Sequence, residues 1–223
     1  PADEDFGIVF KRTDLDKNNF IKVSPENIAT SKYCSKLKNK YGVCVSTVEH
    51  LLATLHSFDI NNVLIEINSA ELPAMDGSSY EFSKKLIEVG LYNQKKPKKI
   101  LKILKKVSIK EGLRSIKVLP SDQLSFSIKI NFSNNFIGKD HYIYTHNTQN
   151  FIDEICYART FCVSKDVVKL RAAGFGLGGN LNNAIVVEDN KILNESGLRC
   201  NKEFVKHKIL DCVGDFYMSG LPL

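Results

Sequence analysis

With 223 residues, 43% of them apolar, the chain can build hydrophobic cores for one large domain or two small ones. No stretch approaches the roughly 18 uncharged apolar residues of a transmembrane helix, and the N-terminus is acidic and polar, so we expect neither a membrane span nor a signal peptide. The net charge of +6 is compatible with a nucleic acid, an anionic membrane surface or a phosphate-bearing ligand.

The cysteines show no CxxC or CxH spacing that would predict a metal site or a redox motif. Because no secretion signal accompanies them, we expect reduced thiols in a cytoplasmic protein. The six positions are Cys34, Cys44, Cys156, Cys162, Cys200 and Cys212.

The first part of the chain alternates helical and strand-like segments. STVEHLLATLHSFD (46–59) has helical periodicity, and NNVLIEI (61–67) is strand-like. MDGSSYEFSKKLIEVGL (75–91) opens with an Asp-Gly turn and predicts a helix that stops near Gly90. Helices that can pack on strands predict an α+β domain.

The lysine-rich segment KKPKKILKILKK (95–106) is the best candidate for a domain boundary. Its lysines alternate with Ile and Leu, and no aromatic stacking platform accompanies them, which favours a basic linker running into a strand over a nucleic-acid patch. We therefore predict a first domain over residues 1–94, a second domain over 107–223 and no nucleic-acid partner.

Downstream of the linker, strand-like and helical segments again follow one another. Residues 115–120 and 124–132 alternate as half-buried strands do, and 164–176 predicts a helix capped by Gly174. The remaining segments are two short strands that suit a hairpin and a last helix, at 183–187, 191–194 and 203–217. The glycine-rich run GFGLGG (174–179) follows a helix and lacks the P-loop lysine, so we predict a loop.

Two short segments carry candidate metal-binding or catalytic residues. In the last helix, His207 and Asp211 are one turn apart and can converge on one ion, and Asp215 extends the same stripe. The alternative is a solvated helix face with an i,i+4 ion pair. In STVEHLLATL (46–55), Glu49 and His50 open a helix with a core-facing apolar stripe, although Glu49 would also complete a capping box with Ser46.

Together the two segments predict a zinc centre. Two histidines and one carboxylate, His50, His207 and Asp211, leave a fourth position open, as in catalytic rather than structural zinc sites. Such a zinc acidifies its bound water, and Glu49 can take the proton during hydrolysis of an amide or ester. No HExxH is present, so the metalloprotease signature does not apply.

Several motifs, in this order and at these intervals, resemble the UDP-3-O-acyl-N-acetylglucosamine deacetylases, the zinc enzymes that commit bacteria to lipid A synthesis. The motifs, within residues 41 to 223, are STVEHLLATL, ELPAMDGSS, ARTF, LNESGLR and EFVKHKILDCVGDF. The resemblance implies two related α+β domains, each a helix layer on a mostly antiparallel sheet, whose helices face each other with the zinc between them.

The resemblance also implies roles for individual residues. His50, His207 and Asp211 would bind one Zn²⁺ per chain, and Glu49 would be the general base that activates the water. Thr160 would polarise the substrate carbonyl or hold the oxyanion, and Lys208 would add positive charge there. Asp215 would be a carboxylate outside the set of ligands that helps to orient them.

The family's acyl chain lies in an apolar passage formed by an insert of the second domain. The matching stretch here runs from about residue 161 to 184, and these apolar residues suit either a passage lining or a core. The candidates for the lining are Phe161, Val163, Val167, Val168 and Leu170.

The chain also departs from the family pattern. The family's general acid is a histidine in a Gly-His motif beyond the last helix, and this chain stops before it at MSGLPL. We therefore expect a piece that lacks both termini. His56, His141 and His146 do not match the position of the acid, and we expect each to be a surface or loop histidine.

We expect the protein to be a monomer. Two alternatives to the deacetylase function remain open. One is a related zinc amidohydrolase that acts on another acyl-sugar. The other is a non-catalytic binder of a lipid or nucleotide-sugar that kept the fold; the complete set of metal ligands and base argues against it.

Overall fold

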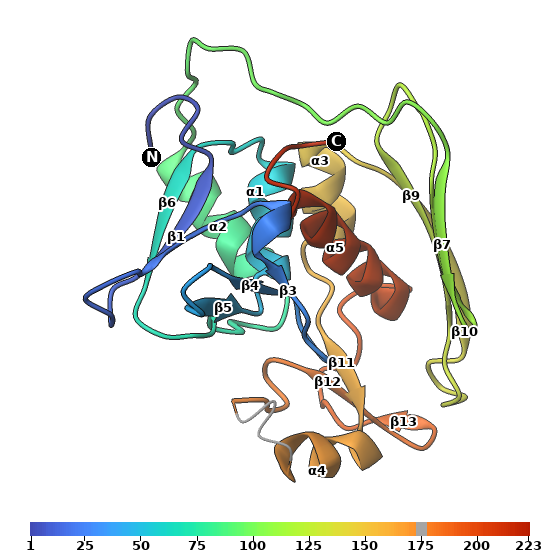
Figure 1. The fold of residues 1–223 in the computed structure, drawn as a ribbon. Coiled ribbons are helices and arrows are strands. Elements are labelled where there is room, and N and C mark those ends of the chain that lie inside the picture. Colours follow the sequence, from blue (N-terminus) through green and yellow to red (C-terminus); the bar gives the residue numbers. More distant parts are fainter. Residues whose placement is uncertain (173–177) are drawn as a thin grey trace.

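The computed structural model describes residues 1–172 and 178–223, which form helices and small, mostly antiparallel sheets (Figure 1). Only two strand pairs are parallel, β1 (Ile8–Arg12) with β6 (Val63–Ile67) and β11 (Phe161–Val163) with β12 (Ile185–Glu188), among the described residues. The predicted α+β class is confirmed. None of the helices in the described ranges is long and apolar enough to cross a membrane.

The first half of the chain builds two three-stranded sheets and two helices. One sheet has the order β2-β1-β6 and the other β3-β4-β5. The further elements are β2 (Phe20–Lys22), η1 (Pro25–Asn27), β3 (Ile28–Ala29), β4 (Lys36–Lys38), β5 (Cys44–Ser46), α1 (Glu49–Ser57) and α2 (Tyr80–Val89). Helix α2 ends at Gly90, as its sequence predicts.

Residues 95–106, the predicted linker, form neither helix nor strand and run across the top of the molecule between α2 and β7 (Figure 1). The described residues of the second half then form two hairpins, a small three-stranded sheet and four helical segments. Its elements are β7 (Val107–Glu111), β8 (Arg114–Val118), β9 (Ser125–Asn131), β10 (Lys139–Thr145), α3 (Thr148–Asn150), η2 (Phe151–Ile155), α4 (Ser164–Ala172), β13 (Lys191–Ile192) and α5 (Glu203–Tyr217).

The small sheet β11-β12-β13 and helix α4 project from the rest of the molecule (Figure 1). Strand β11 and helix α4 lie within the predicted insert of about residues 161–184, and β12 and β13 follow it. The predicted hairpin is confirmed, since β12 and β13 pair in antiparallel fashion. The predicted helix over 164–176 is present up to Ala172. Its predicted cap at Gly174, and residues 174–177 of the glycine-rich run, lie outside the described residues.

Helices α1 and α5 pack against each other at the centre of the fold (Figure 1). Gly214 of α5 allows this close approach: a Cβ atom there would lie 2.0 Å from the carbonyl oxygen of Glu49. The core of the first half includes Tyr217 and Met218 from the end of α5, and the core around β9 and β10 includes Ala53 from α1. The two helices therefore join the two halves.

Candidate metal centre

The predicted polar stripe of the last helix runs from a buried His207 through a half-buried Asp211 to an exposed Asp215. His207 is 1% exposed, so the alternative of a solvated face is wrong for this residue. Asp211 lies one turn further along α5, with its Oδ1 3.4 Å from Nε2 of His207. Helical spacing thus brings the two side chains together as the sequence predicts.

Helix α1 supplies the third member of the cluster. Nε2 of His50 also lies 3.4 Å from Oδ1 of Asp211, and the two imidazole rings meet edge to face with centroids 5.1 Å apart. The ligand atoms of His50, His207 and Asp211 all lie within 4.8 Å of one another. Crossing of α1 and α5 at Gly214 therefore assembles the predicted trio from residues far apart in sequence.

The hydrogen bonding of His207 prepares it as a ligand. Its Nδ1 lies 3.0 Å from the carbonyl oxygen of Ala158, which can only accept, so Nδ1 carries the proton and Nε2 has a free lone pair. Burial lowers the pKa of His207 to about 3, which keeps the ring neutral. Metal binding requires this neutral form.

The charges around Asp211 keep it ionised. Burial acts to raise its pKa, but the neighbouring His207 and Lys208 outweigh that effect and hold the pKa well below the ordinary value. Two imidazole nitrogens and one ionised carboxylate oxygen, with no fourth protein donor among the described residues, match the donor set of catalytic zinc sites. The residues present therefore fit zinc.

Glu49 lies beside the cluster at the first turn of α1 and is 8% exposed. Its Oε2 accepts a hydrogen bond from the backbone N–H of Ser35 at 3.0 Å. The capping-box alternative is wrong, because Ser46 is the last residue of β5 and Thr47 turns the chain with a φ of 60°, so that the helix begins only at Glu49. Burial raises the pKa of Glu49 to about 7, and His50 partly offsets this rise.

A pocket of about 180 Å³ opens in front of Glu49 and Asp211. Asp215 stands at its exposed rim, and Oγ of Ser35 donates to Oδ1 of Asp215 at 2.5 Å. Tyr33 and Cys34 complete the wall. Sequence analysis did not assign a function to residues 33–35, since nothing in their local pattern predicts contact with either helix.

Lys208 lies between the cluster and the insert. Its Nζ donates to Oδ2 of Asp211 at 2.6 Å and stands 5.4 Å from the ring centroid of Phe161. Thr160 immediately precedes β11, and its backbone N–H donates a hydrogen bond to the carbonyl of Gly77 at 2.7 Å. The segment with Thr160 thus contacts the loop before α2.

The predicted lining residues differ in their burial and in their distance from the metal cluster. Phe161 lies against the site, with its centroid 6.1 Å from that of His207. Val163 is half-buried against the core around β12, whereas Val167 is half-buried and Val168 is 73% exposed on α4. The side chain of Leu170 lies outside the described part of the structure.

The expectation of a surface or loop histidine is wrong for His56, whereas His146 lies in the loop that follows β10. His56 is buried on α1, where its ring stacks on Tyr217 and lies 4.7 Å from the ring of His146. His141 is half-buried on β10 and shares a hydrogen bond with Ser127. None of the three belongs to the trio of ligands.

Comparison with known proteins agrees with this geometry. The chain matches the family described as LpxC, UDP-3-O-acyl N-acetylglycosamine deacetylase, over residues 1–223. It is 41% identical over 223 residues to the UDP-3-O-acyl-N-acetylglucosamine deacetylase of a Nitratiruptor species, covering 100% of this chain and 74% of the relative. It is 44% identical over 220 residues to the deacetylase of that name from Nautilia profundicola, covering 99% of this chain and 74% of the relative.

A further relative comes from Neisseria meningitidis serogroup B and bears the same name. The identity is 42% over 234 residues, covering 100% of this chain and 74% of the relative. The chain thus spans about three quarters of the length of these relatives. With a match over its whole length, the chain belongs to the UDP-3-O-acyl-N-acetylglucosamine deacetylase family.

Proposed function

We propose that this protein is a zinc-dependent deacetylase that hydrolyses the acetamide of UDP-3-O-acyl-N-acetylglucosamine, releasing acetate in the committed step of lipid A synthesis. The observation that carries the proposal is the convergence of His50, His207 and Asp211 beside the buried carboxylate of Glu49. Family membership supports the same substrate.

One zinc ion would be held by Nε2 of both histidines and Oδ1 of Asp211. Zinc supplies Lewis acidity, which lowers the pKa of water and polarises a carbonyl oxygen. The protein contributes fixed ligand orientations, because Ala158 sets the tautomer of His207 and Lys208 keeps Asp211 charged.

Glu49 is the proposed general base. Its pKa of about 7 lies close to neutral pH, where a carboxylate can both accept and return a proton. The N–H of Ser35 fixes one carboxylate oxygen, and we assign to the carboxylate the proton of the attacking water. No second base is required for the attack on the acetamide carbon.

Negative charge that develops on the acetamide oxygen needs donors and cations nearby. We assign this role to the hydroxyl of Thr160 and to the ammonium of Lys208, the latter held close to the cluster through Asp211. Asp215, linked through Ser35 to the segment that also holds Glu49, supports the charge balance of the site.

The acyl chain is proposed to enter along the insert. Phe161 marks the start of the path, since its ring lies against both His207 and Lys208. Val163, Val167, Val168 and Leu170 continue along β11 and α4. The net charge of +6 suits an anionic nucleotide-sugar, and we expect the enzyme to act as a cytoplasmic monomer.

The test is acetate release from UDP-3-O-acyl-N-acetylglucosamine by the full-length protein, with and without a metal chelator. We expect release that stops with chelator and returns with added zinc. Zinc-loaded, folded protein that releases no acetate would contradict the proposal and favour a binder or an enzyme for another acyl-sugar.

A further inference from the structure

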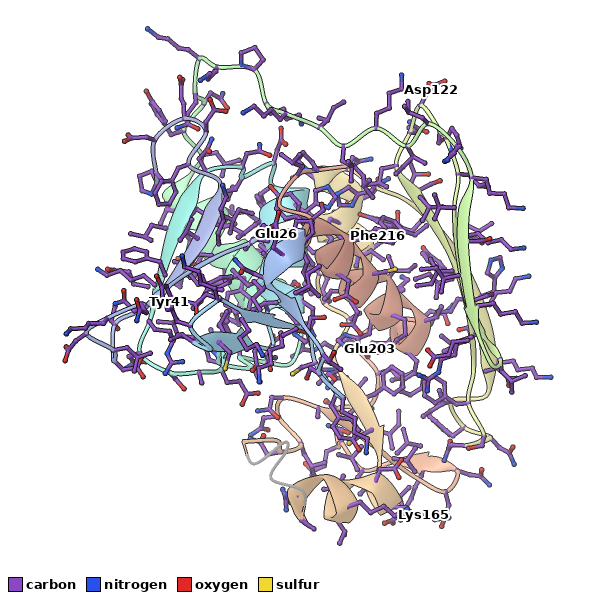
Figure 2. All side chains as sticks on the ribbon, viewed as in Figure 1. Glu26, Tyr41, Asp122, Lys165, Glu203 and Phe216 are labelled. Carbon is purple, nitrogen blue, oxygen red and sulfur yellow. The ribbon has the colours of Figure 1, made fainter. Side chains whose placement is uncertain are left out.

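A fully buried ion pair lies next to the metal centre and takes no part in the proposed chemistry. Glu203, the first residue of α5, is 0% exposed, and Arg159 is 3% exposed. Nε of Arg159 donates to Oε1 of Glu203 at 2.8 Å, and Nη2 donates to Oε2 at 3.2 Å. Glu203 lies at the end of α5 that faces the insert (Figure 2).

Backbone groups complete the shell of this carboxylate. The N–H of Arg159 donates to Oε1 at 3.0 Å, and the N–H of Arg199 donates to Oε2 at 2.6 Å. Nη2 of Arg159 also donates to the carbonyl of Gly197 at 2.7 Å. Both the side chain and the main chain of Arg159 are therefore fixed to the start of α5.

The residues on either side of Arg159 contact or form the site. The carbonyl of Ala158 accepts a hydrogen bond from Nδ1 of His207 at 3.0 Å. Thr160, the proposed oxyanion donor, is fixed through its N–H to Gly77 and through its carbonyl to the N–H of Ile185. Glu203 is one turn before His207 on the same helix, so one carboxylate sets the position of both partners of the Ala158–His207 bond.

Burial of an ion pair costs desolvation energy that mutual attraction often only just offsets, so such a pair is weak evidence for a purely stabilising role. Outer partners of metal-binding histidines, by contrast, regularly set ligand orientation and metal affinity. We infer that Glu203 and Arg159 are positioning residues that hold Ala158 and Thr160 in register with His207, and so determine zinc affinity and turnover. The inference rests on the proposed function.

The test compares full-length Glu203→Gln and Arg159→Lys with the parent protein. Glu203→Gln keeps the shape but places an amide N–H₂ group against donors, whereas Arg159→Lys keeps the charge but loses the planar pair of donors. We expect the zinc dissociation constant, measured by chelator competition, to rise about 10-fold, the lower end of the effect for outer partners. We expect kcat to fall and KM to stay unchanged, because Thr160 acts on the reacting carbonyl.

A second arginine–carboxylate pair provides the matched control. Arg12, 8% exposed, donates to both oxygens of Asp14 and to the carbonyl of Cys44, and none of these residues belongs to the metal-binding group. Arg12→Lys should lower the free energy of unfolding in a similar way. Its zinc affinity and kcat should equal those of the parent.

The outcomes separate the two proposals. A parent that binds no zinc or releases no acetate contradicts the proposed function. A functional parent whose Glu203→Gln and Arg159→Lys forms lose stability as Arg12→Lys does, but keep zinc affinity and kcat, overturns the inference. Failure of both variants to fold also overturns it, because the pair would then serve the whole fold rather than the site.

Discussion

At the scale of single residues, the carboxylate of Glu49 is the group on which turnover should depend most. Burial raises its pKa to about 7, and Ser35 fixes one of its oxygens. We predict that Glu49→Gln, which keeps the shape and removes the base, lowers kcat by about 10²- to 10⁴-fold, the usual contribution of a general base. Acetate release under saturating substrate measures this loss.

Zinc content distinguishes this loss from a loss of metal. Glu49→Gln should bind zinc as the parent does, because Glu49 is not among the three ligands. His207→Ala is the counterpart: it removes a ligand, so zinc affinity should fall together with kcat. A Glu49→Gln protein with full turnover, or a His207→Ala protein that still binds one zinc tightly, would show that these assignments are wrong.

His56 makes stability depend on pH. Burial lowers its pKa to about 4 from the ordinary 6.5, so the unfolded chain binds more protons than the folded one between these values. Stability is therefore complete above about pH 6.5 and falls as the pH drops towards 4. At about 1.4 kcal/mol per pKa unit, the loss is on the order of 3 kcal/mol.

The groups around His56 do not reverse this sign. The ring of Tyr217 stacks on His56, and the tilted ring of His146 lies 4.7 Å away, with a pKa lowered by burial to about 3. Asp59 raises the pKa of His56 and Lys98 lowers it. His56→Phe keeps the stack without a titrating group, so urea unfolding should vary less between pH 7 and 4.5. His141→Gln on β10 is the control, and an unchanged pH profile for His56→Phe would refute the assignment.

At the scale of elements, the crossing of α1 and α5 builds the site. A methyl group on Gly214 would lie 2.0 Å from the carbonyl oxygen of Glu49 and 3.0 Å from the N of Ala53, and both are backbone atoms that cannot rotate away. Gly214→Ala should therefore push the helices apart, at a cost of about 1–3 kcal/mol, typical of overpacking. Zinc affinity should fall as well, because His50 moves away from Asp211.

Thermal unfolding and chelator competition measure the two effects of Gly214→Ala. Gly178→Ala is the matched control, since no atom lies within 4 Å of its added methyl group. A Gly214→Ala protein with the stability and zinc affinity of the parent would contradict this prediction. It would mean that the helices can move apart without loss of stability or of the metal site.

The same elements explain what the sequence could predict. The His207–Asp211 spacing and the apolar stripe around His50 are local patterns with helical period, so the sequence could predict helices α1 and α5. Motif resemblance added the pairing of the two helices. The capping box at Ser46 failed because a strand and a turn at Thr47 occupy the positions that a longer helix would need.

Contacts between distant segments left no local pattern to detect. Ser35 reaches Glu49 and Asp215 only after β4 and α5 are in place, and Glu203 meets Arg159 across 44 residues. His56 lies on α1 itself, and its burial depends on packing against Tyr217 of α5, which no local pattern predicts. These contacts depend on tertiary structure, which periodicity does not encode.

At the scale of the whole molecule, the two halves are joined by the linker and by the α1–α5 contact. Residues 95–106 carry no regular structure and run along the outside (Figure 1), whereas the cores of both halves include residues of both central helices. The linker is attached through exposed polar contacts: the first lysines contact Glu4 and Asp5, Lys98 contacts Asp59, and the N–H of Leu101 donates to the carbonyl of Pro222. Packing of the helices should therefore hold the halves together without an intact linker.

We predict that a specific protease site inserted after Lys99, once cut in the folded full-length protein, leaves two fragments that elute together and keep zinc. The reason is that one fragment supplies His50 and the other His207 and Asp211, so metal and helix packing both oppose separation. Gel filtration and zinc content measure the result, and the uncut protein is the control. Chelator should weaken the association, since ligand binding across the interface stabilises it. Fragments that separate with zinc present would contradict the prediction and would mean that the halves stay together only through the covalent linker.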